Sequence, residues 1–407
     1  MKILFLHPNF PAQFWHLSKA FANMGDKVVY LTTKTNGNHL QGVTTAVYKR
    51  SREVTKDIHE YLKPADEAII DGTSVIDALG QLRKNHHFVP DVIVGHTGWG
   101  STMYCKDYYP DVPLLGYFEW YYKSHGSDAA YFPGEQISLS EAMRIRTRNM
   151  HHLLNLETCD VRFTPTQWQK SQFPERYQEG MKVIHEGIDT DFCRPQQGRK
   201  LILEKTDTRE ALDLSKCPEI LTYVSRGFEP YRGFPQFMEA VSLLLKRRPK
   251  LHVVIVGTDT SCYGVAPKGT TWKKYVDERV SYDKKRVHFV GHLNRPDYQT
   301  VLQASTVHVY LTRPFILSWS CLEAMSFGCA MVGSKTPPVE EVITDGENGL
   351  LANFRSPQHI AMRVEELLDH PELRKRLGAA ARRTVLDRYD MRDCVRQQVN
   401  MVYEAMK

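Results

Sequence analysis

The chain has 407 residues, well over twice a common domain length of about 150, so we expect two domains. Hydrophobic residues make up 42% and charged residues 25%, a composition typical of globular proteins that excludes disordered, collagen-like and low-complexity chains. The formal net charge of +6 is modest for this length. Because the basic residues form no dense run with interleaved aromatics, we expect no nucleic-acid partner.

The apolar runs are strand-sized. LLGYF (114–118) and HVVIVG (252–257) are far shorter than the roughly 20 apolar residues of a membrane span. Met1-Lys2 passes directly into ILFL, which we interpret as a first strand rather than a signal peptide. The eight cysteines are scattered and include no CxxC pair, so neither a disulfide framework nor a zinc site is indicated. We expect a cytoplasmic protein and leave open a peripheral association with the inner face of a membrane.

A first series of strands and helices covers the N-terminal half. KILFL (2–6) predicts a strand, a helix with Phe14, Leu17 and Phe21 on one face closes at Gly25, and KVVYL (27–31) predicts the next strand. Further strands are predicted at DVIVG (91–95), PLLGYF (113–118) and VRFTP (161–165). Each run is nearly continuously apolar, as expected where helices cover both faces of a parallel sheet.

The same pattern restarts after VIHEGIDTDFCRP (183–195). Strands are predicted at EILTYV (219–224), LHVVIVG (251–257), VHFVG (287–291), VHVYL (307–311) and AMVGS (330–334). Residues 357–407 predict charged helices, one of them starting at Pro371. The sequence therefore predicts an α/β fold of two doubly wound domains. Since ligands of such sheets bind outside the carboxyl ends of the strands, the cleft between the domains is the expected active site.

The most specific pattern lies in TRPFILSWSCLEAMSFGCAMVGSKTPPVEEVITDGENGLL (312–351). With VSRGFEPYRGF (224–234), VGTD (256–259) and VHFVGHL (287–293), it resembles the retaining, nucleotide-sugar-dependent glycosyltransferases of family four, the glycosyl transferases group 1. These enzymes have the GT-B fold of two Rossmann-like domains facing across a cleft. The resemblance implies an acceptor-side domain at 1–182, a nucleotide-sugar-binding domain at 183–385, and a helix at 386–407 that packs back on the N-terminal domain.

The nucleotide-sugar donor is expected at the start of a predicted helix, Cys321–Phe327. Ser318, Trp319 and Ser320 precede this helix, so their amides and hydroxyls suit a diphosphate at a helix N-terminus. The resemblance implies that Glu323 accepts hydrogen bonds from both ribose hydroxyls and that Gly291, at the end of VHFVG, also belongs to the donor site. From the residues alone, the alternative for Glu323 is a solvated or capping helix residue.

Two arginines follow EILTYV. Arg226 and Arg232 match the Arg and Lys of the family that neutralise the diphosphate, and fixed positive charge there stabilises a nucleoside diphosphate leaving group without a metal. The alternative is two surface arginines in ion pairs with Glu229. Phe315 replaces the first Glu of the family signature. Either the sugar contacts differ, with Ser318 or Ser320 compensating, or Phe315 simply packs.

The N-terminal half has its own candidates just past its strands. The resemblance implies catalytic roles for His96 and for Glu119, which stands where many members have His. A structural pair of Glu119 with Lys123 is the alternative. Asn9 and Gln13 in HPNFPAQF (7–14) are the acceptor-side candidates, and either could instead cap the following helix.

Asp189-Thr190-Asp191 has the form of a metal-binding DxD, but it lies inside the interdomain segment, so we interpret Asp189 as a turn residue. We expect no metal and no cofactor. The sequence predicts a metal-independent hexosyltransferase of polysaccharide or glycoconjugate biosynthesis. It would move a sugar from a nucleotide diphosphate donor, for which we favour UDP, to a hydroxyl of a glycan, lipid-linked or small-molecule acceptor. The alternatives are a non-catalytic sugar-nucleotide-binding or scaffold protein, and another GT-B enzyme such as an epimerase or phosphorylase.

Overall fold

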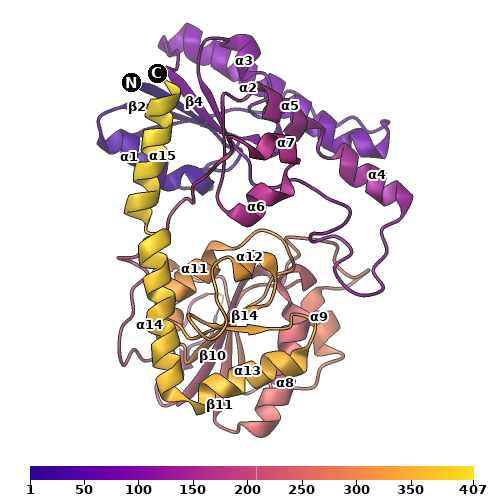
Figure 1. The fold of residues 1–407 in the computed structure, drawn as a ribbon, viewed down its shortest axis with the longest axis vertical. Helices are drawn as coiled ribbons and strands as arrows, with labels where there is room; N and C mark the ends of the chain where they lie inside the picture. Colours follow the sequence, from indigo (N-terminus) through magenta and orange to yellow (C-terminus); the bar gives the residue numbers. More distant parts are fainter. Residues whose placement is uncertain (208) are drawn as a thin grey trace. The chain divides into compact units, whose positions relative to one another are not determined.

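The computed structural model describes residues 1–207 and 209–407, which form two compact units. Unit 1 comprises Met1–Gly187 and Met391–Lys407, and unit 2 comprises Ile188–Asp390 (Figure 1). The expected ranges divided the chain after 182 and after 385, whereas both junctions lie a few residues further along. In unit 2 the amide of Ile188 donates to the carbonyl of Tyr389 at 2.8 Å, so the two ends of this unit lie side by side.

Unit 1 is built on a seven-stranded sheet whose strands are paired in parallel in the order β3-β2-β1-β4-β5-β6-β7. Successive side chains of a strand point to opposite faces of the sheet, and both faces are covered by an apolar core. Ile3 and Phe5 lie in one apolar core and Leu4 and Leu6 in the other. The strands are β1 (Lys2–Leu6), β2 (Lys27–Thr32), β3 (Val43–Val47), β4 (Val92–His96), β5 (Leu114–Tyr117), β6 (Val161–Thr164) and β7 (Lys182–Val183).

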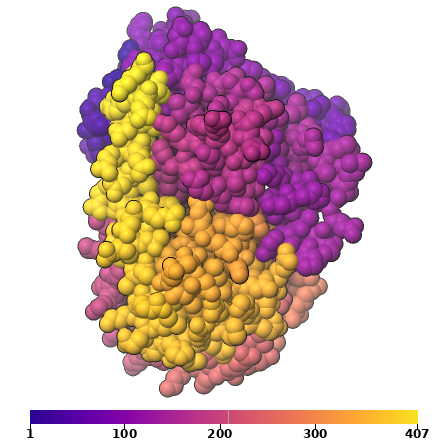
Figure 2. Space-filling model, in the orientation of Figure 1, coloured from indigo at the N-terminus to yellow at the C-terminus, as the bar shows by residue number. Residues whose placement is uncertain are grey.

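Helices cover both faces of this sheet. Phe14 and Phe21 join the core of Ile3 and Phe5, which Met401 and Val402 of the C-terminal helix also enter, while the outer side of that helix lies on the surface (Figure 2). The helices of unit 1 are η1 (Ala12–Phe14), α1 (Trp15–Asn23), η2 (Glu60–Leu62), α2 (Lys63–His86), η3 (Thr97–Trp99), α3 (Cys105–Tyr108), α4 (Leu139–Thr147), α5 (Met150–Thr158), α6 (Gln167–Gln172), α7 (Glu175–Gln178) and α15 (Met391–Ala405).

Unit 2 repeats the architecture on a six-stranded parallel sheet in the order β12-β11-β10-β13-β14-β15. The strands are β10 (Glu219–Gly227), β11 (Leu251–Thr258), β12 (Val287–Gly291), β13 (Val307–Tyr310), β14 (Met331–Ser334) and β15 (Leu350–Ala352), with a separate antiparallel pair, β8 (Ile202–Leu203) and β9 (Leu212–Asp213). The helices are η4 (Pro230–Arg232), α8 (Phe234–Arg247), α9 (Trp272–Asp277), α10 (Arg295–Gln303), α11 (Trp319–Ser326), α12 (Pro337–Glu340), α13 (Pro357–Asp369) and α14 (Pro371–Arg388).

The two sheets confirm the predicted doubly wound α/β class, and both orders reverse at a central pair of strands. In unit 1 the reversal lies between β1 and β4, and in unit 2 between β10 and β13. The loops that follow such a pair of strands are where doubly wound sheets bind ligands. The eight cysteines are all free thiols. Among the helices of the described residues, none combines the length and the apolar character needed to span a bilayer.

Candidate functional site

The reversal point of unit 2 brings together two loops that the sequence singled out. Arg226 lies at the end of β10 and Arg232 in the turn η4 that follows, while Ser318 and Ser320 lie in the loop and helix that follow β13. Because β10 and β13 are neighbouring parallel strands, their carboxyl ends meet at one edge of the sheet. The predicted diphosphate residues therefore come from adjacent loops.

Arg232 is a buried cation that binds neutral groups. Its side chain is 7% exposed, and Nη1 donates to the Tyr310 hydroxyl at 3.0 Å, to Thr312 Oγ1 at 2.9 Å and to the Ile316 carbonyl at 2.9 Å. Arg226 is exposed, and its Nε donates to Cys262 Sγ at 3.1 Å. In the part of the chain that the structure describes, neither guanidinium forms an ion pair with a carboxylate. Because Arg232 is desolvated without a paired anion, the site can accept negative charge from a ligand.

Glu229, the alternative ion-pair partner of both arginines, has another role. It is completely buried, and its Oε2 accepts hydrogen bonds from the amides of Cys262 and of Tyr263, the latter at 2.9 Å. Burial raises the pKa of its carboxyl above the usual range, although the two amides and the charges of both arginines oppose this rise. Through these hydrogen bonds Glu229 connects the loop after β10 to the loop after β11.

An aromatic cluster lies beside these arginines. The ring of Phe315 is 4.9 Å from that of Tyr263 and 5.4 Å from that of Tyr231, and Phe315 is 6% exposed. The structure therefore agrees with the packing alternative for Phe315. The guanidinium of Arg232 lies 5.4 Å from the centre of the Tyr263 ring and that of Arg313 lies 5.1 Å from the Tyr231 ring. Arg313 adds a third guanidinium that the sequence analysis did not identify.

Helix α11 begins where the donor residues were predicted. Ser318 is its N-cap, and Ser318 Oγ accepts a long hydrogen bond of 3.4 Å from the Ser320 amide. The Ser318 amide donates to the Tyr310 hydroxyl at 2.8 Å, the same hydroxyl that accepts from Arg232. Tyr310 therefore connects the helix start to the arginine. Trp319, the first helical residue, is 42% exposed.

Glu323 is neither a freely solvated residue nor the cap of α11. Its Oε2 accepts a hydrogen bond of 2.7 Å from the hydroxyl of Tyr298, on α10. Burial raises the pKa of the Glu323 carboxyl, while the Tyr298 hydrogen bond and the charge of Arg295 oppose this rise. The tyrosine orients the carboxylate, and Oε1 has no hydrogen bond from the described residues. The role of Glu323 toward ribose stays a prediction.

The two remaining predicted residues of this unit, Gly291 and Asp189, lie outside the loops that follow β10 and β13. Gly291 ends β12, the edge strand, and has φ +71°, a left-handed conformation that favours glycine. Asp189 forms the expected turn, because its Oδ1 accepts from the Phe192 amide at 2.9 Å and its carbonyl from the Cys193 amide at 2.8 Å.

The reversal point of unit 1 holds two histidines whose tautomers follow from their hydrogen bonds. His7 Nδ1 accepts from the Asn9 amide at 2.9 Å, and His96 Nδ1 from the Gly98 amide at 3.0 Å. Both rings therefore carry their proton on Nε2. Burial keeps the pKa of His7 well below its usual value, so His7 is neutral at pH 7. The two rings lie 5.0 Å apart, edge to face.

Glu119 joins these elements. Gln13 Nε2 donates to Glu119 Oε1 at 2.9 Å, and His96 Nε2 lies 3.5 Å from Glu119 Oε2. Lys123, the alternative partner, donates to the Ser171 carbonyl at 3.2 Å. The structure thus brings together Gln13, His96 and Glu119, whereas Asn9 contributes a backbone amide to His7. Neither Asn9 nor Gln13 caps η1 or α1.

Several site residues were missed by the sequence analysis. Arg313 directly follows the strand VHVYL and Thr312, so its position after a strand was a usable signal. His7 likewise follows β1 directly. Tyr263 and Tyr298 lie in a loop and on a helix without a distinctive motif, and only the tertiary structure brings them to Arg232 and Glu323.

Comparison with known proteins assigns the family. Residues 24–193 match a family described as "Glycosyl transferase family 4 group", and residues 204–384 match "Glycosyl transferases group 1". The chain belongs to the group 1 glycosyltransferases, a family of transferases, as the motifs in 224–351 had indicated.

Curated relatives are distant. A D-inositol 3-phosphate glycosyltransferase of Corynebacterium diphtheriae is 22% identical over 314 residues, which cover 74% of this chain and 68% of that protein. A protein of the same name from Corynebacterium glutamicum is 25% identical over 60% of this chain and 56% of its own length. A putative glycosyltransferase of Bacillus subtilis, EpsD, is 26% identical over half of each chain.

Solved structures share the fold. The Anabaena protein HepE, solved in complex with UDP-glucose, superposes with a TM-score of 0.70 at 15% identity, covering 99% of this chain and all of that one. Sucrose-phosphate synthase from Thermosynechococcus elongatus also has a TM-score of 0.70, at 16% identity, over 99% and 98% of the two chains. Both similarities confirm the GT-B fold predicted from the sequence.

Proposed function

We propose that this protein is a retaining, metal-independent glycosyltransferase that moves a hexose from a nucleotide diphosphate sugar, with UDP as the favoured nucleotide, to an acceptor hydroxyl. Unit 2 binds the donor and unit 1 binds the acceptor. The observation that carries this proposal is Arg232: a buried guanidinium without a carboxylate partner in the described residues, beside the exposed Arg226 and near the first turn of α11.

In this proposal Arg226 and Arg232 neutralise the diphosphate as the sugar–phosphate bond breaks, which is the role that a metal ion has in other transferases. The amides at the start of α11 bind phosphate oxygens, and Glu323 accepts from the ribose hydroxyls. Gly291 and Trp319 line the donor. UDP is favoured because HepE was solved with UDP-glucose, and retention because the 312–351 motif resembles retaining enzymes.

For the acceptor, Glu119 and His96 are proposed to contact the reacting groups. His96 offers an Nε2 proton, and Glu119 a negative charge that stabilises an oxocarbenium-like centre. Retention then proceeds by front-face attack, with the leaving phosphate accepting the acceptor proton, so no pair of catalytic carboxylates is needed. A glycan, a lipid-linked oligosaccharide and a small molecule remain the acceptor classes, and peripheral contact with the inner face of a membrane is compatible with each.

A thermal-shift panel of UDP, GDP, ADP and their glucose conjugates tests the proposal, because a ligand that binds the folded protein raises its melting temperature. We expect the UDP compounds to give the largest shifts and UDP-glucose to be slowly hydrolysed without acceptor. Strong binding with no release of sugar would favour the non-catalytic alternative. No shift with any nucleotide would overturn the donor site.

A further inference from the structure

Unit 1 contains a small cavity next to the His96 loop. Its volume is about 180 Å³, below the roughly 300–1,000 Å³ of pockets for drug-sized ligands, so it fits a group of about one ring. Three aromatic side chains, Trp99, Trp120 and Tyr122, contribute to the lining. Charged groups come from α2, from the segment after β3 and from Arg148, between α4 and α5.

The walls are held by close backbone packing. A Cβ on Gly100, which has φ +86°, would lie 2.3 Å from the carbonyl oxygen of Ala68, and a Cβ on Gly72 would lie 2.9 Å from the Gly100 oxygen. Both positions therefore require glycine, and α2 lies directly against the loop of residues 97–104. The cavity is a defined feature of the fold.

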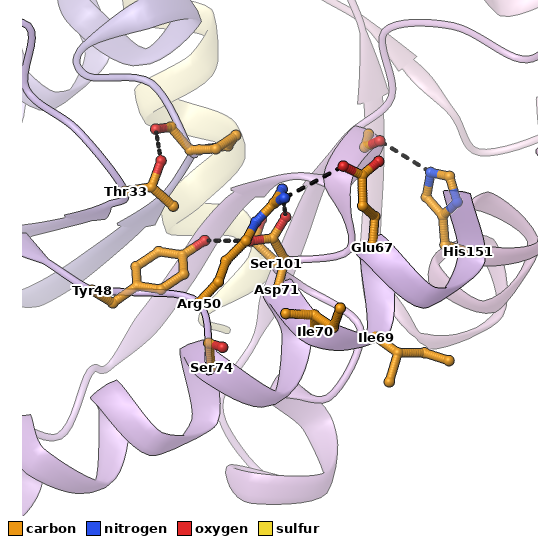
Figure 3. A network of polar contacts seen from close by, with 12 residues as sticks. Thr33, Tyr48, Arg50, Glu67, Ile69, Ile70, Asp71, Ser74, Ser101 and His151 are labelled. Carbon is orange, nitrogen blue, oxygen red and sulfur yellow. Dashed lines mark hydrogen bonds and ion pairs between the residues drawn. The ribbon is translucent and has the colours of Figure 1, made fainter. Parts of the chain in front are cut away.

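His151, which is 6% exposed, lines the cavity and has a buried ring nitrogen without a hydrogen-bond partner among the described residues. Its Nε2 lies 3.0 Å from the carbonyl oxygen of Gly98, and because a carbonyl only accepts, the ring proton is on Nε2 (Figure 3). Burial lowers the pKa of His151 to about 4, so the ring is neutral at pH 7. Nδ1 is therefore a bare acceptor, and it has no hydrogen-bond partner within residues 1–207 and 209–407.

The charges of the lining are nearly balanced. Arg50 is paired with the buried Asp71, through contacts of 2.7 and 3.0 Å, and reaches Glu67 at 3.4 Å (Figure 3). Arg148 lies over the ring of Tyr122 at 3.9 Å. With Glu119, three carboxylates and two guanidinium groups line the cavity, and of its three histidines, His96, His151 and His152, His151 is neutral at pH 7.

We propose that this cavity binds a neutral, polyhydroxylated ring of the acceptor and discriminates against a phosphorylated one. The inference rests on the proposed function, and it names the chemical class of the acceptor. Hydroxyl groups can donate to His151 Nδ1 and to the carboxylates and accept from Arg148, while the apolar face of a sugar ring packs on the aromatic side chains. A phosphate monoester is mostly a dianion at pH 7, so it donates poorly and would be repelled by the three carboxylates.

Saturation-transfer NMR titrations of the full-length protein test this class directly. The probes are glucose, mannose and N-acetylglucosamine, each compared with its 6-phosphate. We expect at least one neutral sugar to bind and its phosphate to bind about tenfold more weakly. Tighter binding of the phosphates, or no binding of any neutral sugar, would overturn the inference.

Three variants and one control locate the binding. His151→Phe keeps a ring but removes the acceptor nitrogen, and Arg148→Gln changes an exposed side chain. Each should weaken binding of the neutral sugar about tenfold. The control His86→Gln, at the exposed end of α2, should leave that binding unchanged. Glu67→Gln should shift the preference toward the 6-phosphate by removing a negative charge. If the folded Arg148→Gln and His151→Phe proteins bind the neutral sugar with wild-type affinity, the sugar does not bind in this cavity.

The same samples, titrated with UDP, separate this inference from the proposed function. Sugar binding that depends on His151 and Arg148 without any response to UDP would sustain the inference and remove the donor proposal. Binding of UDP and transfer to an acceptor, without binding of a neutral sugar in this cavity, would sustain the proposed function and overturn the inference.

Discussion

Glu119 is the residue that most clearly links elements of unit 1, because it accepts from Gln13 and lies beside the Nε2 proton of His96. An amide at this position preserves the shape and removes the charge. Since we propose that the donor nucleotide binds unit 2, its binding should not depend on this change.

We therefore expect Glu119→Gln to lower the turnover number by about 10²–10³-fold while the dissociation constant of UDP stays within twofold of wild type. Steady-state kinetics and UDP titration measure the two quantities, with Glu175→Gln, on the exposed face of α7, as a matched control. A parallel loss of UDP affinity would instead point to damaged folding.

Glu323 makes the stability of the protein depend on pH. Burial raises the pKa of its carboxyl in the folded protein above the usual 4.5, so the folded protein binds more protons than the unfolded chain in that window. The free energy of unfolding contributed by this group therefore falls as the pH rises from the unfolded pKa through the folded one.

Glu323→Gln removes this contribution and retains an oxygen for Tyr298. The variant should gain stability relative to wild type between pH 4.5 and pH 7, as measured by urea denaturation at each pH. Glu347→Gln, an exposed residue of the same unit, should show no such trend. A difference between Glu323→Gln and wild type that is independent of pH would contradict the raised pKa.

At the residue scale, prediction from sequence placed Arg226 and His96 at the ends of strands. The structure has them at the ends of β10 and β4, at the reversal points of the two sheets, and their roles stay predictions. The same prediction has clear limits. It failed for Tyr298 and His151, since a hydrogen bond to Glu323 or to a loop carbonyl depends on packing between elements distant in sequence.

At the element scale, the turn between β10 and α8 decides where Arg232 lies. Gly233 has φ +66°, and a Cβ there would lie 2.7 Å from Leu311 Cβ and 3.0 Å from Phe354. Both a left-handed backbone and a lack of space therefore require glycine at this position.

Gly233→Ala should cost about 2–5 kcal/mol of unfolding free energy, from backbone strain together with overpacking, and should weaken UDP binding because the turn carries Arg232. Gly269→Ala is the control: it has φ +74° but nothing within 4 Å of the added Cβ, so it should cost only about 1–2 kcal/mol. If urea denaturation shows the same loss of unfolding free energy for Gly233→Ala and Gly269→Ala, the lack of space at Gly233 contributes nothing to the cost.

The predicted strands were found with boundaries within a few residues, because most of them are apolar runs buried on both faces. The edge strand β3 was missed because only Val43 of its residues is buried, so it lacks a continuous apolar run. The three-residue β15 was missed because it lies inside the 312–351 motif and is too short for a periodic pattern.

For the whole molecule, the C-terminal helix α15 completes the core of unit 1 although it follows unit 2 in sequence. Met401 and Val402 are at most 1% exposed in that core, and Gln398 donates to the His185 carbonyl at 2.9 Å. A change in this helix should therefore destabilise unit 1.

Met401→Ala should cost about 2–5 kcal/mol and lower the unfolding transition of unit 1, whereas UDP should raise that of unit 2. Met406→Ala, at a partly exposed position of 37%, should change stability by less than about 0.5 kcal/mol. Differential scanning calorimetry distinguishes the transitions. If Met401→Ala and UDP act on one and the same transition, the units do not unfold separately.

The central claim is that Arg226 and Arg232 bind the diphosphate of the donor. Calorimetric titration of uridine and of UDP into wild type, Arg226→Ala, Arg232→Ala and the exposed control Arg279→Ala tests it most directly. We predict that each site variant loses about 2–4 kcal/mol of UDP binding and little of uridine binding, because only UDP carries the charge that the guanidiniums neutralise. Unchanged UDP affinity in the folded Arg226→Ala and Arg232→Ala proteins, or an equal loss for uridine, would contradict the claim.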